Sequence, residues 1–158
     1  MATTPNSIIT PQTPNAGVAG VLLTTAMTNT KAFDGTDTPG TALALVYTVG
    51  ANGGKIDNVF VRFASASGST ATGTTAATVV RLWANNGSAN TTATNNIFLG
   101  EALVPATAVT ALATSANSVA AQFTGIPTLP AGYKLYVGST VAIGGTLALA
   151  VSAFGGDF

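Results

Sequence analysis

The chain has 158 residues, enough for one domain with a hydrophobic core; 47% are hydrophobic and only 6% charged, whereas an average soluble domain has roughly 25% charged residues. Five basic and five acidic residues give a formal net charge of zero, which excludes a highly charged disordered chain and a basic surface that binds nucleic acid. A near-neutral surface rich in Thr, Ala, Ser, Asn and Gly suits a protein docked in an assembly, because little charge opposes association; the alternative is an ordinary soluble domain that tolerates low charge.

Residues 1–17 are predicted to form an extended N-terminal arm, and residues 18–158 a single domain. Three Thr-Pro steps in the arm each push the residue before the proline out of the helical region. The arm is either a frayed terminus or a segment that lies on a neighbouring subunit, with Ile8 and Ile9 as its apolar anchor. The first residues lack the features of a signal peptide, and no run of about 18 apolar residues predicts a membrane span.

Beyond the arm, eight short segments rich in β-branched and aromatic residues alternate with turn residues such as Asp-Gly, Asn-Gly and Gly-Gly. The segments predicted to be strands are 18–27, 42–49, 55–64, 77–84, 96–104, 118–123, 133–139 and 146–154. Eight short strands with this punctuation predict a sandwich or a barrel. The Ala-rich stretch 106–116 has the composition of a short helix, but its threonines disfavour one, and we predict a connection.

Several of these segments alternate apolar with small or polar residues, which is typical of a sheet with one face on a core. The expected core faces are Leu43, Leu45, Tyr47 and Val49; Val59, Val61 and Phe63; Tyr133, Leu135 and Val137; and Leu147, Leu149 and Val151. Two low-complexity segments, 65–75 and 85–96, are predicted to be exposed, mobile loops unless a partner orders them.

The same alternation places two pairs of side chains on the outside of the sheets. Phe60 and Arg62 point outward from one strand, and Arg81 and Trp83 from another. Each pair joins an arginine to a large aromatic residue, and both residue types are enriched at protein interfaces. The alternative is that one of these arginines neutralises Glu101, which the preceding glycine turns outward if it forms a bulge.

The segment after the last predicted strand reads Phe-Gly-Gly-Asp-Phe and ends in Phe158. An aromatic residue after two glycines either folds back to cap the sandwich, which is the more common arrangement, or inserts into a neighbouring subunit. We therefore include Phe158 among the candidate interface residues.

No arrangement of catalytic residues is recognisable. The chain has neither His nor Cys, so it lacks the usual general base, the usual nitrogen ligand of metals and a thiolate nucleophile, and no Ser-x-x-Lys pattern offers a lysine base. Only Asp34 and Asp37 among the acids are close in sequence; they supply part of the roughly six to eight oxygens that calcium needs, and an Asp-Gly turn explains them equally well. We predict a protein that is not an enzyme and that binds neither a cofactor nor a metal ion.

Four features run over most of the chain: a Pro/Thr-rich start, Ala/Thr/Gly-rich strands, the run Leu-Pro-Ala-Gly-Tyr-Lys-Leu-Tyr-Val at 129–137, and a Gly-Gly-Asp-Phe ending. In these features the chain resembles small decoration or virion-surface proteins of tailed bacteriophages. The resemblance implies a jelly-roll or related β fold. It also implies binding to the major capsid protein, often as a homotrimer, and no catalytic residues.

The fold expected from these observations is all-β: a single-domain antiparallel β-sandwich, jelly-roll-like, with about eight strands and an extended N-terminal arm. The expected function is that of a capsid decoration, or cement, protein, made in the host cytoplasm, which binds the outer capsid at subunit junctions and stabilises the shell. Two alternatives stay open: another phage component of the tail, collar or fibre, and a carbohydrate-binding module that uses Trp83 beside Tyr133 or Tyr136. Neither nucleic acid nor a membrane is an expected partner.

Overall fold

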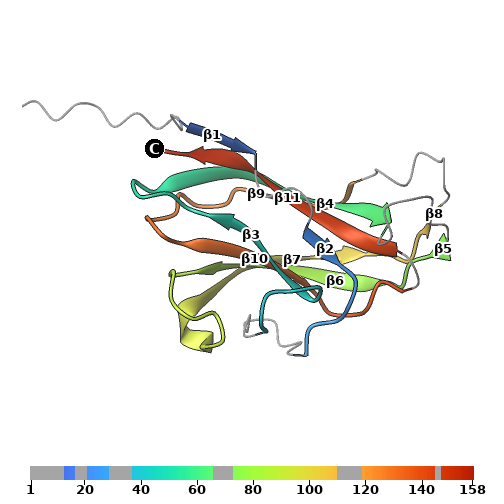
Figure 1. Ribbon diagram of the computed structural model, residues 1–158. Helices are drawn as coiled ribbons and strands as arrows, with labels where there is room; N and C mark the ends of the chain where they lie inside the picture. The colour runs from blue at the N-terminus through green and yellow to red at the C-terminus, as the bar shows by residue number, and fades with distance from the viewer. Residues whose placement is uncertain (1–12, 17–20, 29–36, 66–72, 110–118, 145–146) are drawn as a thin grey trace, which may run out of the picture.

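The protein is a two-layered β structure in the computed structural model, which describes residues 13–16, 21–28, 37–65, 73–109, 119–144 and 147–158. Two antiparallel sheets pack face to face, and a short ribbon of β5 (Gly73–Thr74) and β8 (Ala108–Val109) lies at one end (Figure 1). The helical structure in the described ranges is the single turn η1 (Ala93–Asn95). No helix in those ranges has the length and apolar character needed to span a bilayer.

The first sheet, sheet A, has the strand order β1-β11-β4-β9, and β2 also pairs with β11. Its strands are β1 (Thr13–Ala16), β2 (Val21–Leu23), β4 (Gly54–Ser65), β9 (Val119–Thr124) and β11 (Leu147–Asp157). The second sheet, sheet B, has the order β3-β10-β6-β7. Its strands are β3 (Leu43–Thr48), β6 (Thr78–Asn85), β7 (Asn96–Val104) and β10 (Lys134–Ser139).

The strand pairs are nested along the chain, which identifies the topology. The outermost pair is β1 and β2 with β11, followed inward by β3 with β10, β4 with β9, and β6 with β7, all antiparallel. This is the pairing of a jelly roll, in which one long hairpin wraps into two sheets. The predicted sandwich is confirmed, and each of the eight predicted strands occurs; β1, β5 and β8 were not predicted.

Strand β1 lies within the segment predicted as an arm. Its residues pair with β11 from Thr13 opposite Asp157 to Ala16 opposite Phe154, so this part of the chain extends sheet A. The candidate anchor residues Ile8 and Ile9 lie outside the described residues.

The main core lies between the sheets and confirms three of the predicted faces. The buried members include Val59, Val61 and Phe63 of β4, Leu135 and Val137 of β10 with Tyr133 packed beside them, and Leu147, Leu149 and Val151 of β11. Because one face of each strand supplies these residues, the other face is left to form the outside of the sandwich.

The prediction for β3 is wrong in part. Tyr47 lies opposite Leu135 and Leu45 opposite Tyr136, which leaves Val46 as a bulged residue between them. A bulge shifts the alternation by one residue, so Val46 and Tyr47 both enter the main core. The leucines at 43 and 45 face the other side of sheet B, in a second hydrophobic cluster.

Segment 85–96 is also not the wholly exposed loop that was predicted. Asn85 and Asn90 are buried, and asparagine side chains cross-link the segment. Asn85 Nδ2 donates to Asn96 Oδ1 at 2.9 Å, and Asn90 Nδ2 donates to the Asp37 carbonyl at 2.6 Å. The asparagines therefore bind the loop to its own strands and to the connection between β2 and β3. Most of segments 65–75 and 106–116 lies outside the described residues.

Candidate functional site

The outer face of sheet A presents the first predicted pair. Val59 and Val61 point into the core, so Phe60 and Arg62 point away from it, as predicted. Phe60 is half-buried and Arg62 is exposed. Phe60 lies opposite Gln122 of β9 on one side and Ser152 of β11 on the other, which places it near the middle of the sheet.

A second aromatic residue completes this surface. Phe154 of β11 is 40% exposed, and its ring meets that of Phe60 edge to face, with centroids 5.6 Å apart and planes at 73°. The guanidinium carbon of Arg62 lies 5.2 Å from the Phe60 ring centroid, within cation–π range. On the same face, Gln122 Nε2 donates to Asn58 Oδ1 at 2.8 Å. We call these five residues, Asn58, Phe60, Arg62, Gln122 and Phe154, the docking face.

Sequence interpretation missed Phe154, although a signal was present. Leu149, Val151 and Ala153 alternate into the core, which puts Phe154 on the outer side of β11. The sequence did not show that Phe154 lies next to Phe60, because this contact depends on the pairing of β11 with β4.

Arg62 has no acidic partner in the described part of the chain, where two other cations do. Lys55 Nζ lies 3.4 Å from Asp57 Oδ1, and Arg81 Nε lies 3.1 Å from Glu101 Oε2. The docking face therefore combines exposed aromatic surface with a positive charge that these described acids do not neutralise.

The outer face of sheet B is different, and the predicted exposure of Trp83 is wrong. Trp83 does point away from the main core, but it is fully buried in the second cluster with Met27, Leu43 and Tyr136. Its ring meets Phe98 edge to face at 6.1 Å. Its Nε1 is buried and has no hydrogen-bond partner among the residues that the structure describes.

The cover over Trp83 comes from the connection between β2 and β3, and we call its residues 24–28 and 37–42 the covering segment. Met27 N donates to the Ser139 carbonyl at 2.8 Å, and Ser139 Oγ donates to the Thr25 carbonyl at 2.9 Å. The segment passes below sheet B in Figure 1. The alternation within β6 carries no information about this segment, which is why the sequence did not reveal the burial.

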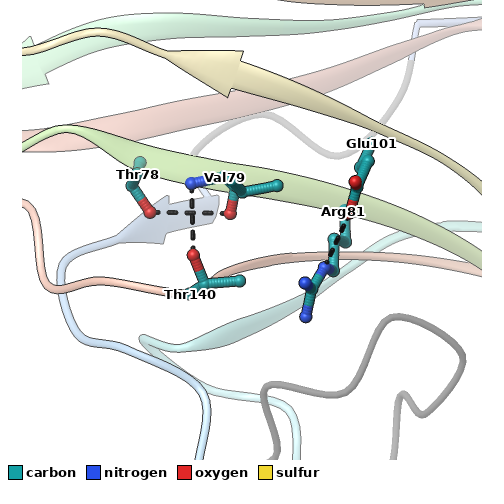
Figure 2. Close-up of polar contacts among 5 residues, drawn as sticks. All are labelled: Thr78, Val79, Arg81, Glu101 and Thr140. Carbon is teal, nitrogen blue, oxygen red and sulfur yellow. Dashed lines mark hydrogen bonds and ion pairs between the residues drawn. The ribbon is translucent and has the colours of Figure 1, made fainter.

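Arg81, the other member of that pair, is neutralised within the chain. Figure 2 shows its ion pair with Glu101, and Arg81 is the more buried partner, with 13% of its side chain exposed against 48% for Glu101. The alternative prediction of an intramolecular partner is thus confirmed. The predicted bulge is present too, since Leu82 faces Gly100 whereas Trp83 faces Phe98.

A smaller apolar patch lies beside this ion pair. Leu103 is 70% exposed and sits opposite Val79, and Val141 is 43% exposed. The segment before Val141 is held to β6 by two hydrogen bonds. Thr140 N donates to the Val79 carbonyl at 3.0 Å. Val79 N donates to Thr140 Oγ1 at 3.1 Å, as Figure 2 shows.

Phe158 folds back against its own chain. Its backbone N–H donates to the Gly53 carbonyl at 3.0 Å, and its ring lines an open hollow of about 390 Å³ with residues 51–53 and 128–131. The adjacent Asp157 accepts hydrogen bonds from the Tyr47 hydroxyl at 3.0 Å and from Gly50 N at 2.9 Å. A Cβ on Gly50 would lie 2.7 Å from Asp157 Oδ2, so this position has no room for a side chain.

The side-chain carboxylates of the described residues all have partners within the chain. Asp37 accepts from the backbone N–H of Thr28 at 2.8 Å and from its hydroxyl, and Asp57, Glu101 and Asp157 have the partners given above. Those residues include no group of three potential metal ligands, and Asp34 lies outside them. The docking face therefore offers groups for contact with a partner: an aromatic pair, two amides and a guanidinium.

No protein-family model, curated protein or solved structure matches the chain.

Proposed function

We propose that the protein is a non-enzymatic component of a virus particle that binds the outer surface of a capsid, at junctions between subunits, and stabilises the shell. The observation that carries the proposal is the docking face, where exposed Phe154, half-buried Phe60 and Arg62 lie together on a broad sheet. Aromatic residues, phenylalanine included, and arginine are enriched at protein interfaces relative to the rest of the surface. The jelly-roll sandwich supports it as a stiff platform for such a face.

The mechanism is additive. A standard interface buries roughly 1,600 Å² in total, and such contacts, repeated over the many equivalent junctions of a capsid, oppose an outward force that no single one resists. The low charge of the chain supports close packing on a lattice, because few charged side chains need to be desolvated on binding.

Burial of Trp83 weighs against the carbohydrate-binding alternative. That alternative relied on an exposed tryptophan beside a tyrosine, whereas Trp83 is fully buried and Tyr136 is only 4% exposed.

A role in the tail, collar or fibre predicts a handful of copies per particle, and a role on the head predicts hundreds. Mass-spectrometric copy number in purified particles separates the two.

The direct experiment adds purified protein to capsids assembled without it and measures binding and resistance to heat. Phe154→Ser is expected to weaken binding at least about tenfold, because it removes an exposed aromatic contact. The matched control Leu103→Ser removes a more exposed apolar side chain from sheet B and is expected to bind like the wild type. Wild-type protein that neither binds capsids nor protects them contradicts the function. Loss of binding in Leu103→Ser alone contradicts the choice of face.

A further inference from the structure

The charge on the docking face indicates the chemistry of its partner. The carbon atom of the Arg62 guanidinium lies over the Phe60 ring, 5.2 Å from its centroid, and within the described residues its N–H donors make no hydrogen bond or ion pair. Within the described ranges no carboxylate lies within ion-pair distance of Arg62, and the contact of Arg62 there is with the Phe60 ring. The cation is therefore positioned by its own chain but not neutralised by the described acids.

We infer that the surface bound by the docking face is a protein surface that presents an Asp or Glu carboxylate to Arg62, surrounded by apolar side chains that cover Phe60 and Phe154. This inference rests on the proposed function and specifies its partner. The two N–H groups on one edge of a guanidinium match the two oxygens of a carboxylate, which gives a directional pair of hydrogen bonds.

A polyanion fits this surface less well than a single carboxylate. Binding to nucleic acid or another phosphate polymer requires several clustered cations, whereas the docking face contains one. The nearest cation along β4, Lys55, already pairs with Asp57. The other members of the face are two aromatic rings and the hydrogen-bonded amides of Asn58 and Gln122, which fit an apolar partner surface with a few polar groups.

Burial strengthens such a pair. When the partner covers Phe154 and Phe60, water is excluded around Arg62 and its attraction to a carboxylate increases. Removing one member then leaves the other charge buried without a partner, so the loss of affinity is large and appears mainly as faster dissociation.

The first test measures capsid binding by Arg62→Gln at several salt concentrations. We expect at least about tenfold weaker binding, together with loss of the salt dependence that the wild type shows, because salt screens the charge pair. The matched control Lys134→Gln removes a positive charge from sheet B and is expected to keep both affinity and salt dependence.

The second test identifies the partner group. Arg62→Lys places a primary amine on the docking face; on bound capsids, a water-soluble carbodiimide activates a nearby carboxylate, and the amine displaces the urea to form an amide. Mass spectrometry is expected to find a cross-link from position 62 to an Asp or Glu of the capsid protein. Lysines at 31, 55 and 134 are common to both proteins, so the wild type controls for their cross-links.

The outcomes separate this inference from the proposed function. If Phe154→Ser weakens binding but Arg62→Gln does not, the carboxylate partner is wrong and the function stands. If a uronic acid polysaccharide binds the free wild-type protein but not Arg62→Gln, the partner is an acidic glycan and the inference is overturned. If wild-type protein does not bind capsids, the proposed function itself fails.

Discussion

The two outer faces of the sandwich carry the same local pattern, an arginine two residues from a large aromatic on a central strand, and the fold treats them differently. On sheet A, Arg62 and Phe154 remain exposed beside Phe60, and none of the described acids neutralises the arginine. On sheet B, Trp83 is buried and Arg81 is paired with Glu101. The same two residue types thus stabilise the fold on one face and form a candidate interface on the other.

The physical cause of the difference is the route of one connection. The covering segment crosses sheet B and closes the second cluster over Trp83, and Asn90 fastens it through the Asp37 carbonyl. A face that is covered contributes to folding stability, whereas an open face is available for binding. If this is correct, substitutions on the covered face of sheet B should lower the free energy of unfolding, and substitutions on the open face of sheet A should change it little.

Removal of the buried tryptophan is expected to have the largest effect. Trp83→Ala should lower the free energy of unfolding by about 3–5 kcal/mol, since it empties a fully buried site. Phe154→Ala should lower it by about 1 kcal/mol or less, because that ring is exposed and makes one aromatic contact. Urea unfolding followed by circular dichroism measures both. Equal losses would mean that the two faces are not distinct.

A methyl group added at Gly138 tests how tightly the covering segment packs on sheet B. An added Cβ on Gly138 would lie 3.0 Å from Met27 Cγ and 3.1 Å from Leu43 Cδ1, so Gly138→Ala should cost about 1–3 kcal/mol. The cost should shrink in a Met27→Ala background, where the main obstacle is gone. The matched control is Gly100→Ala, whose Cβ comes no nearer than 3.9 Å to Phe123. An unchanged cost without Met27 would place the strain elsewhere.

Alkaline pH should weaken the covered face. Burial raises the pKa of Tyr136 above its ordinary value of 10.0, because the ionised phenolate is poorly solvated there. The contribution of Tyr136 to the free energy of unfolding is fully present below pH 10 and is lost as the pH rises above that value. The reason is that the phenol then loses its proton more readily in the unfolded chain than in the folded protein. Urea unfolding between pH 9 and about 11 should show a shallower decline for Tyr136→Phe than for the wild type. Identical slopes would contradict the burial of this phenol.

The ion pair should have the smallest effect. A double-mutant cycle of Arg81→Ala and Glu101→Ala should give a coupling energy of about 0.2–1 kcal/mol, because Glu101 is half exposed.

Arg62→Gln should change the free energy of unfolding by about 0.5 kcal/mol or less while it weakens binding to the partner. A large loss of stability in Arg62→Gln would assign Arg62 to the fold and not to the interface.

Alternation and turn residues were sufficient to predict the eight main strands and the β-sandwich. Val59, Val61 and Phe63, or Leu147, Leu149 and Val151, face the core because a strand places every second side chain on the same side. The outward direction of Phe60, Arg62, Arg81 and Trp83 follows from the same rule. Each of these is a property of a short stretch of chain.

Tertiary structure decided which outward residues remain exposed. The bulge at Val46, the contact of Phe154 with Phe60 and the burial of Trp83 by Met27 all join residues that are distant in sequence. Strand periodicity is set by the backbone of each segment, but burial depends on the route of the connections and on the neighbours that they bring. For this reason the outward direction of Phe60 and Arg62 could be predicted from the chain, whereas the position of Phe154 and of the amide pair beside them required the fold.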